Sequence, residues 1–149
     1  MRYWLFKSEP FKWSWERQKA AGEKGQEWDG VRNYQARNFM REMAVGDRGF
    51  FYHSNEGKAV VGIVEVAAPA HPDSTAKDDP RWECVDLRAV ADVPQPVTLD
   101  AIKAEPRLKD MVLVNNSRLS VQPVAEAEFR LICTLGGLDP QTVMAPPAG

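Results

Sequence analysis

Hydrophobic and polar positions along the chain fall into short runs, and the first run predicts a buried strand. It places Trp4 and Phe6 on one face and Tyr3 and Leu5 on the other. A strand that is covered on both faces has this pattern. The polar segment Lys7-Ser8-Glu9-Pro10 ends the run, because proline removes a backbone donor and disfavours helix at the residue before it. Three polar side chains are therefore expected at the end of a central strand.

Two helices are predicted in the next part of the chain. Ser14 is suited to cap a short helix that ends near Ala21, and a charged loop follows it. The second helix begins at Asn33 or Tyr34, and its apolar positions at i, i+3, i+4 and i+7 predict a core face: Ala36, Phe39, Met40 and Met43. We interpret the tryptophans beside the first helix, Trp13 and Trp15, as packing groups.

A hairpin is predicted after the second helix. The runs 48–54 and 58–67 are joined by Asn55-Glu56-Gly57, which is typical of a tight turn. Gly62 lies inside the second run and permits close approach of another backbone or a ligand. Residues 69–80 predict a polar loop.

Further elements are predicted in the second half, in this order: a strand at 82–93 with one face in water, a short helix capped by Thr98 and stopped by Pro106, short strands at 111–114 and 119–121, and a final helix with Pro123 in its first turn and Gly136-Gly137 at its end. Five to six short strands with flanking short helices favour an α+β fold with a small curved or closed mixed sheet. Residues 1–137 are expected to form one domain and residues 138–149 a loose tail.

Composition narrows the possible functions. A chain of 149 residues is large enough to bury roughly 68–70% of its unfolded surface without metal or disulfide staples. The formal charge of -2 argues against nucleic-acid binding by bulk charge, so any such contact requires a local basic patch. The sequence predicts neither a signal segment nor a membrane span. We expect a cytoplasmic protein without membrane contact, with a monomer as the preferred oligomeric state.

Several kinds of catalytic and cofactor site are disfavoured by the motifs. Cys84 and Cys133 are far apart and have no histidine at ligand spacing, so no metal is expected. His53-Ser54 is not a catalytic pair, because neighbouring residues on a strand point to opposite faces and there is no GxSxG elbow. Pro72-Asp73 with Glu83-Cys84-Val85 resembles part of a nuclease site but has valine where lysine is needed. Phosphate and dinucleotide motifs are missing, so no cofactor is expected.

Aromatic and hydrogen-bonding residues at the ends of the predicted strands remain as the candidate site. The richest segment is 28–39, which combines a tryptophan, a turn glycine, two arginines and two asparagines at the entry of a helix. The full candidate set is Lys7, Ser8, Glu9, Trp28, Val31, Arg32, Asn33, Tyr34, Arg37, Tyr52, His53, Ser54, Trp82, Ser117 and Arg118.

Five sequence blocks in this order resemble the EVE domain family: YWLFKSEP at 3–10, WDGVRNYQARN at 28–38, FFYHS at 50–54, VGI at 61–63 and SRLSVQPV at 117–124. The resemblance covers about residues 1–135 and implies a PUA-like pseudo-barrel related to YTH and ASCH domains. The chain departs from the family at Phe11, where an acidic residue is common, and at His71, where a tyrosine usually precedes Pro-Asp.

The resemblance implies a non-enzymatic reader of a flipped, modified base in DNA or RNA. Aromatic walls offset the cost of unstacking the base, and polar groups read its edge. The implied walls are Trp28, Tyr52, Trp82 and Tyr34, the implied edge readers are Ser8, Glu9, Asn33 and Ser54, and the implied phosphate contacts are Lys7, Arg32, Arg37, Ser117 and Arg118. Two alternatives stay open: an enzyme that uses Lys7 and Glu9 as a proton-transfer pair on a modified base or small amide, and a module that binds a metabolite or a protein.

Overall fold

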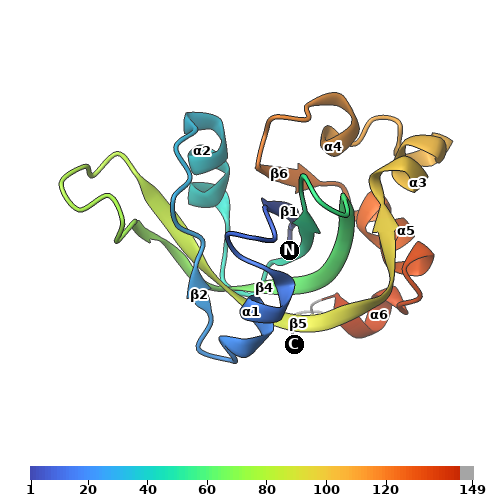
Figure 1. Ribbon diagram of the computed structural model, residues 1–149, viewed down its shortest axis with the longest axis horizontal. Helices are drawn as coiled ribbons and strands as arrows, with labels where there is room; N and C mark the ends of the chain where they lie inside the picture. Colours follow the sequence, from blue (N-terminus) through green and yellow to red (C-terminus); the bar gives the residue numbers. More distant parts are fainter. Residues whose placement is uncertain (145–149) are drawn as a thin grey trace.

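One curved sheet organises the chain. The computed structural model describes residues 1–144, and in this range a single six-stranded sheet has the order β2-β5-β4-β3-β1-β6. Its strands are β1 (Tyr3–Ser8), β2 (Gln26–Glu27), β3 (Arg48–His53), β4 (Ala59–Pro72), β5 (Glu83–Thr98) and β6 (Val121–Val124). The neighbouring strands β1 and β3 run parallel, and the remaining neighbours are antiparallel. The result is the expected α+β fold with a mixed sheet that curves into an open pseudo-barrel (Figure 1).

Short helices surround the sheet. They are α1 (Trp15–Ala20), α2 (Tyr34–Glu42), α3 (Leu99–Ala104), α4 (Val112–Asn115), α5 (Glu126–Leu135), α6 (Pro140–Val143) and the 3-10 turn η1 (Pro106–Leu108). In Figure 1, α2 stands beside the long β4–β5 hairpin, and α3, α5 and α6 gather at the opposite end of the molecule. In the described part of the chain, no helix has the length and apolar character needed to cross a membrane.

The two faces of β1 belong to two different hydrophobic cores, as its pattern predicted. Trp4 and Phe6 pack in the core beneath α1 and α2, whereas Tyr3 and Leu5 pack in the core beneath α3, α5 and α6. Four successive side chains of β1 are buried, from Tyr3 at 5% exposure to Phe6 at 0%. Both faces of the sheet are therefore covered around its centre, and β1 is held rigidly by side chains from both cores.

The two N-terminal helices begin where their caps predicted. The Ser14 hydroxyl accepts a hydrogen bond from the Arg17 amide, and the Asn33 side chain accepts one from the Ala36 amide. Each cap satisfies an amide that has no partner within the helix. The apolar face of α2 buries Ala36 and Met40 in the core, which confirms its helical period.

Predictions around β6 are wrong. Residues 111–114 were expected to form a strand, but Val112–Asn115 is the helix α4, which buries Leu113. Short apolar runs of this kind fit either element by periodicity alone. Pro123 was expected in the first turn of the final helix, but it lies in β6 opposite Trp4, and the helix begins at Glu126. Strand β6 is the last strand of the sheet, and an edge strand tolerates the missing proline donor.

Other boundaries differ from the sequence prediction as well. Strand β4 continues to Pro72, inside the expected polar loop, and β5 continues to Thr98 rather than ending at Val93. The extension of β4 pairs with the start of β5, and the extension of β5 pairs with the start of β4, so the two strands form one long hairpin. Part of the expected tail is also ordered, because α6 buries Val143 in the core beneath α5. The rest of that tail, residues 145–149, lies outside the described residues.

Candidate functional site

A cavity of about 690 Å³ lies at the ends of β1 and β3. The two strands are parallel, so their carboxyl ends meet at the same edge, where the Ser54 amide donates to the Ser8 carbonyl at 2.9 Å. The chain before α1, the segment around β2, the turn after β3 and the loop before β6 complete the walls. The lining residues are Lys7, Ser8, Glu9, Lys12, Trp13, Gln26, Glu27, Trp28, Asp29, Gly30, Val31, Arg32, Ser54, Asn55, Ser117, Arg118 and Ser120.

Two tryptophans line this cavity and differ in how firmly they are held. Trp28 is only 7% exposed, and its ring meets Phe6 and Phe51 edge-on, each at 5.5 Å between ring centres. Trp13 is half-buried, and its indole N–H donates to the Gln18 side chain at 2.8 Å. Trp28 therefore serves as a fixed part of the wall, while Trp13 offers more of its ring to a ligand.

The segment from Trp28 to Arg32 is held in place by Asp73. This carboxylate accepts the Gly30 amide at 2.9 Å and the Arg32 guanidinium at 3.1 Å. Burial raises the pKa of Asp73, but the hydrogen bonds from Thr75, Gly30 and Arg32 outweigh it and hold that pKa below its ordinary value. Asp73, which the sequence analysis weighed as a nuclease ligand, thus shapes the cavity wall as a buried anchor.

Polar side chains at the end of β1 each have a protein partner. The Lys7 ammonium donates to the Ser117 carbonyl at 2.7 Å, and burial lowers its pKa. The Glu9 carboxylate accepts from Asn55 at 3.0 Å and pairs with Lys12 at 3.2 Å. Lys7 and Glu9 therefore have different partners, and each helps to hold one loop of the rim.

Asp29, in the segment after β2, is exposed and lines the cavity. Partial burial raises its pKa, and the nearby carboxylates of Asp73 and Glu27 raise it further. Among the described residues, no hydrogen-bond donor is assigned to its side chain. An acceptor of this kind is available to a ligand that carries an N–H group.

Nine of the predicted site residues surround this cavity together. They come from the end of β1, the segment after β2, the turn after β3 and the loop before β6: Lys7, Ser8, Glu9, Trp28, Val31, Arg32, Ser54, Ser117 and Arg118. Their contact with a ligand stays a prediction. The sequence analysis missed Lys12, Trp13, Gln26, Glu27, Asp29, Gly30, Asn55 and Ser120. Asp29 and Gly30 stand inside the segment that it singled out, whereas Trp13 was interpreted only as a packing group.

Three predicted pocket residues are engaged elsewhere. Tyr52 is 3% exposed in the core beneath α5, on the face of β3 opposite to Phe51, which packs against Trp28. The side chains of a strand alternate between its faces, so Tyr52 cannot share a wall with Trp28. His53 accepts the Trp15 amide at 3.1 Å, and Asn33 caps α2. None of these three residues lines the cavity.

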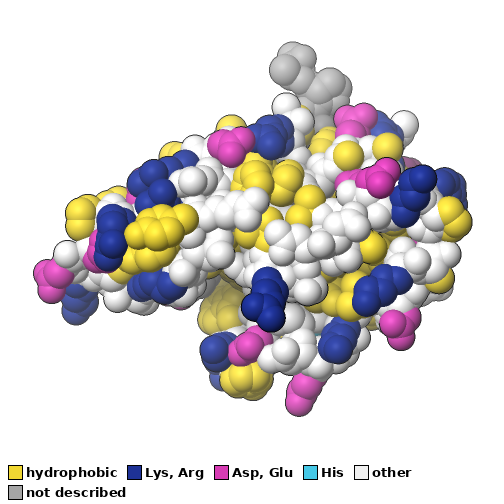
Figure 2. Space-filling model, turned by 90° about the horizontal axis from the view of Figure 1, so that it is seen from above, with side chains coloured by type: hydrophobic (Ala, Val, Ile, Leu, Met, Phe, Trp, Pro, Cys, Tyr) yellow, Lys and Arg dark blue, Asp and Glu magenta, His cyan; other side chains and the backbone are white. Residues whose placement is uncertain are grey.

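Tyr34 and Trp82, which were predicted as pocket walls, and Arg37, which was predicted as a phosphate contact, form a separate surface. The rings of Tyr34 and Trp82 stack at 5.0 Å, and Arg37 lies over Tyr34 at 4.9 Å. Figure 2 shows hydrophobic side chains bordered by Lys and Arg side chains at the end of the molecule formed by α2 and the β4–β5 hairpin. Arg32 joins this surface to the cavity, because it lies over Trp82 at 5.5 Å and also lines the cavity.

The curved sheet, its parallel pair β1 and β3 and the cavity at the end of that pair define a PUA-like protein. Within that class the family can be assigned. The model of the EVE domain matches residues 2–135, and the chain belongs to this family.

Relatives with solved structures have the same fold. A crystal structure of a protein from Agrobacterium tumefaciens is 64% identical with a TM-score of 0.95, over 98% of this chain and 99% of that one. Human THYN1 in complex with 5-methylcytosine-containing DNA is 35% identical with a TM-score of 0.85, over 91% of this chain and 98% of that one. Among curated proteins, mouse thymocyte nuclear protein 1 is 37% identical over 93% of this chain and 75% of its own length.

A more distant structure supports the fold alone. The YTH domain of Zygosaccharomyces rouxii MRB1, in complex with N6-methyladenosine RNA, is 18% identical with a TM-score of 0.56, over 91% of this chain and 86% of that one. The expected likeness of this fold to YTH domains is thus confirmed at the level of the fold.

Proposed function

We propose that this protein binds nucleic acid that carries a modified base, and that the base leaves its stack and enters the cavity between Ser8 and Trp28. The observation that carries the proposal is the similarity to human THYN1, whose structure contains 5-methylcytosine DNA, together with a cavity at the end of the central strands of this chain. The volume of about 690 Å³ lies within the usual range of roughly 300–1,000 Å³ for ligand pockets.

Aromatic contact supplies the first part of the binding energy. Extruding a base costs a few kcal/mol, and stacking on an aromatic side chain returns about 1–3 kcal/mol. Trp13 is the available partner, because Trp28 has most of its surface buried against Phe6 and Phe51. The stacking wall is therefore assigned to Trp13, with the exposed edge of Trp28 as a second contact.

Polar groups in the cavity read the edge of the base. Asp29 lines the cavity, and we assign its carboxylate to accept from an exocyclic amino group, as carboxylates accept from cytosine N4. Ser8 and Ser54 add hydroxyl groups on the wall formed by the strand ends. On the rim, Lys12 and Arg118 supply the local positive charge that an overall acidic chain needs for phosphate contact.

The preference for 5-methylcytosine over cytosine that comes from burial of the methyl group can be estimated. Burial of one methyl group contributes about 0.8 kcal/mol, and about 1.4 kcal/mol gives a tenfold difference in affinity. Methyl burial alone therefore gives a preference of about fourfold. A larger preference requires hydrogen bonds to the base edge or exclusion of the unmodified base by shape.

Binding of short oligonucleotides tests the proposal. Fluorescence anisotropy is measured for DNA and RNA strands with one modified or unmodified base, at a stated salt concentration because affinity depends on it. Trp13→Leu should weaken binding roughly 5- to 150-fold, which corresponds to about 1–3 kcal/mol of lost stacking. Asp29→Asn should change the preference among bases, and Asp110→Asn, an exposed site outside the cavity, serves as its matched control. Equal binding by wild type and Trp13→Leu would refute the assignment of the cavity.

A further inference from the structure

Strand pairing brings four side chains that can bind a metal ion, or can hydrogen-bond to a residue that binds one, to one face of the sheet: Glu27, His71, Cys84 and Asp86. On β4 and β5, His71 stands directly opposite Cys84, and on β2 and β5, Glu27 stands opposite Asp86. Cys84 and Asp86 are two residues apart on one strand and share a face. No histidine lies at ligand spacing from Cys84 in the sequence. The pairing of β4 with β5 nevertheless places His71, 13 positions earlier in the chain, opposite Cys84.

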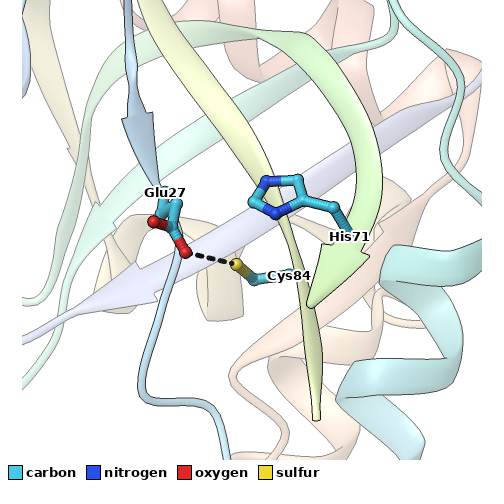
Figure 3. A group of neighbouring side chains, drawn as sticks. All are labelled: Glu27, His71 and Cys84. Carbon is cyan, nitrogen blue, oxygen red and sulfur yellow. Dashed lines mark hydrogen bonds between the residues drawn. The ribbon is translucent and has the colours of Figure 1, made fainter. Parts of the chain in front are cut away.

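The side chains of this cluster point toward one another. Figure 3 shows Glu27, His71 and Cys84 converging from three strands. One ligand atom of each lies within 4.8 Å of the others, and the Cys84 thiol donates to the Glu27 carboxylate at 3.4 Å. Cys84 is fully buried, while Glu27 and His71 are half-buried. The group is thus partly shielded from water and keeps an open side at Glu27, which also lines the cavity.

Asp86 occupies the position of an outer partner. Its carboxylate lies 2.7 Å from Nε2 of His71. A histidine that binds a metal ion through one ring nitrogen commonly donates its other N–H to a carboxylate, which fixes the orientation of the ring. With Nε2 paired to Asp86, Nδ1 is the ring nitrogen left for a metal ion; it lies 3.1 Å from the Pro72 carbonyl oxygen, a contact that the ion would replace.

The charges of the cluster also favour a bound cation. Two carboxylates, Glu27 and Asp86, stand directly opposite each other, and like charges in such a cross-strand pair destabilise a sheet. A divalent cation held next to Glu27 relieves this repulsion.

We propose that Glu27, His71 and Cys84 form a binding site for a zinc ion, with Asp86 orienting the imidazole. Sulfur, nitrogen and oxygen donors from these three residue types are the set that Zn²⁺ uses in proteins, and a water molecule completes a tetrahedral site. Binding releases the Cys84 thiol proton to solvent, because the sulfur binds as the thiolate, and His71 binds through its neutral ring. The ion then supplies positive charge between the two carboxylates.

The site would tie the cavity wall to the hairpin. Strand β2 contains only Gln26 and Glu27 and pairs only with β5, so a bond from Glu27 to a metal ion adds a link to β4. The residues that follow Glu27 are Trp28 and Asp29 in the wall of the cavity. The metal site is independent of nucleic-acid binding, and its test needs no oligonucleotide.

Cobalt substitution tests the proposal directly. The metal-free full-length protein is titrated with Co²⁺, and absorption is followed for thiolate-to-cobalt charge transfer and for the visible bands of a tetrahedral ion. One equivalent per chain is expected, and Zn²⁺ should displace it. Cys84→Ser should remove the charge-transfer absorption, whereas Cys133→Ser, which removes the other buried thiol from the opposite core, should leave it unchanged.

Two further variants, each checked for folding, separate loss of metal binding from loss of structure. Circular dichroism confirms that each variant is folded, and His71→Gln keeps the thiol while removing the ring nitrogen. His71→Gln should abolish the tetrahedral cobalt spectrum, and Asp86→Asn should weaken zinc binding about 10- to 100-fold. Cobalt spectra that lack charge transfer in the wild type, or that persist in folded Cys84→Ser protein, would overturn the proposal.

Discussion

The substitution Gly62→Ala tests how α1 is seated against the sheet beside the cavity. A Cβ atom at Gly62 would lie under 3.0 Å from three ring atoms of Trp15, closer than side chains pack in proteins. The ring cannot move freely, because it is 4% exposed and its N–H donates to Asp92 at 2.7 Å. The sequence analysis expected a backbone or a ligand at Gly62, and the structure shows an indole ring there.

The expected cost of Gly62→Ala follows from this crowding. Overpacking in a filled core costs about 1–3 kcal/mol, which corresponds to a decrease of the urea midpoint on the order of 1 M. Relieving the contact should remove the cost. In a Trp15→Leu background, the same change should be neutral or stabilising, since alanine is favoured over glycine inside a strand by roughly 0.5–1 kcal/mol.

Urea unfolding of the wild type, both single variants and the double variant measures the coupling between the two positions. We expect a coupling energy of about 1–3 kcal/mol, which lies in the upper part of the range for residues in contact. An equal cost for Gly62→Ala in both backgrounds would refute the assignment of the cost to the Trp15 ring. Thermal unfolding without urea provides an independent check of the ranking.

Three other predictions concern the cavity wall, the rim and the sheet. Asp73→Ala should lower the free energy of unfolding by at least about 2 kcal/mol in urea titrations and weaken oligonucleotide binding, because the donors that it anchors lose a buried partner; unchanged stability would contradict this. Arg118→Ala should reduce the slope of log affinity against log salt by about 1, while the exposed Lys103→Ala should leave the slope unchanged. Burial raises the pKa of Glu65, but two arginines outweigh it and hold that pKa below its ordinary value of 4.5. The ion pairs of the Glu65 carboxylate stabilise the folded protein above pH 4.5, and this stabilisation is lost as pH falls through the lower folded-state pKa. Glu65→Gln should therefore lower the free energy of unfolding by about 1.5–3 kcal/mol at neutral pH and by less in acid.

The sequence predicted elements well where local signals agree with packing. Helix α2 has both a capping asparagine and an apolar face with helical period, and its start was found within one residue. The covered strand β1 was recognised from large side chains on both faces. Pro123 shows the limit of such reasoning, because a proline fits the first turn of a helix or an edge strand equally well, and only the pairing of β6 with β1 decides between them.

The candidate site was predicted in part for a related reason. Residues at the ends of parallel strands meet at one edge, and Ser8 at the end of β1 and Ser54 just after β3 both line the cavity, as their positions at predicted strand ends suggested. Tyr52 was misplaced because the sequence does not say which face of β3 borders the cavity. The approach of His71 to Cys84 depends on the register of a hairpin that contains several irregularities, and no local pattern encodes that register.

Extrusion of the modified base is the central claim, and one fluorescence measurement tests it most directly. A duplex carries 2-aminopurine beside a single 5-methylcytosine, so that loss of the stacked neighbour increases its fluorescence. If the base is extruded, the 2-aminopurine fluorescence should increase when the wild-type protein saturates the duplex. The increase should be smaller with Trp13→Leu at equal saturation. Saturated binding, confirmed by anisotropy, without any increase in fluorescence would contradict it.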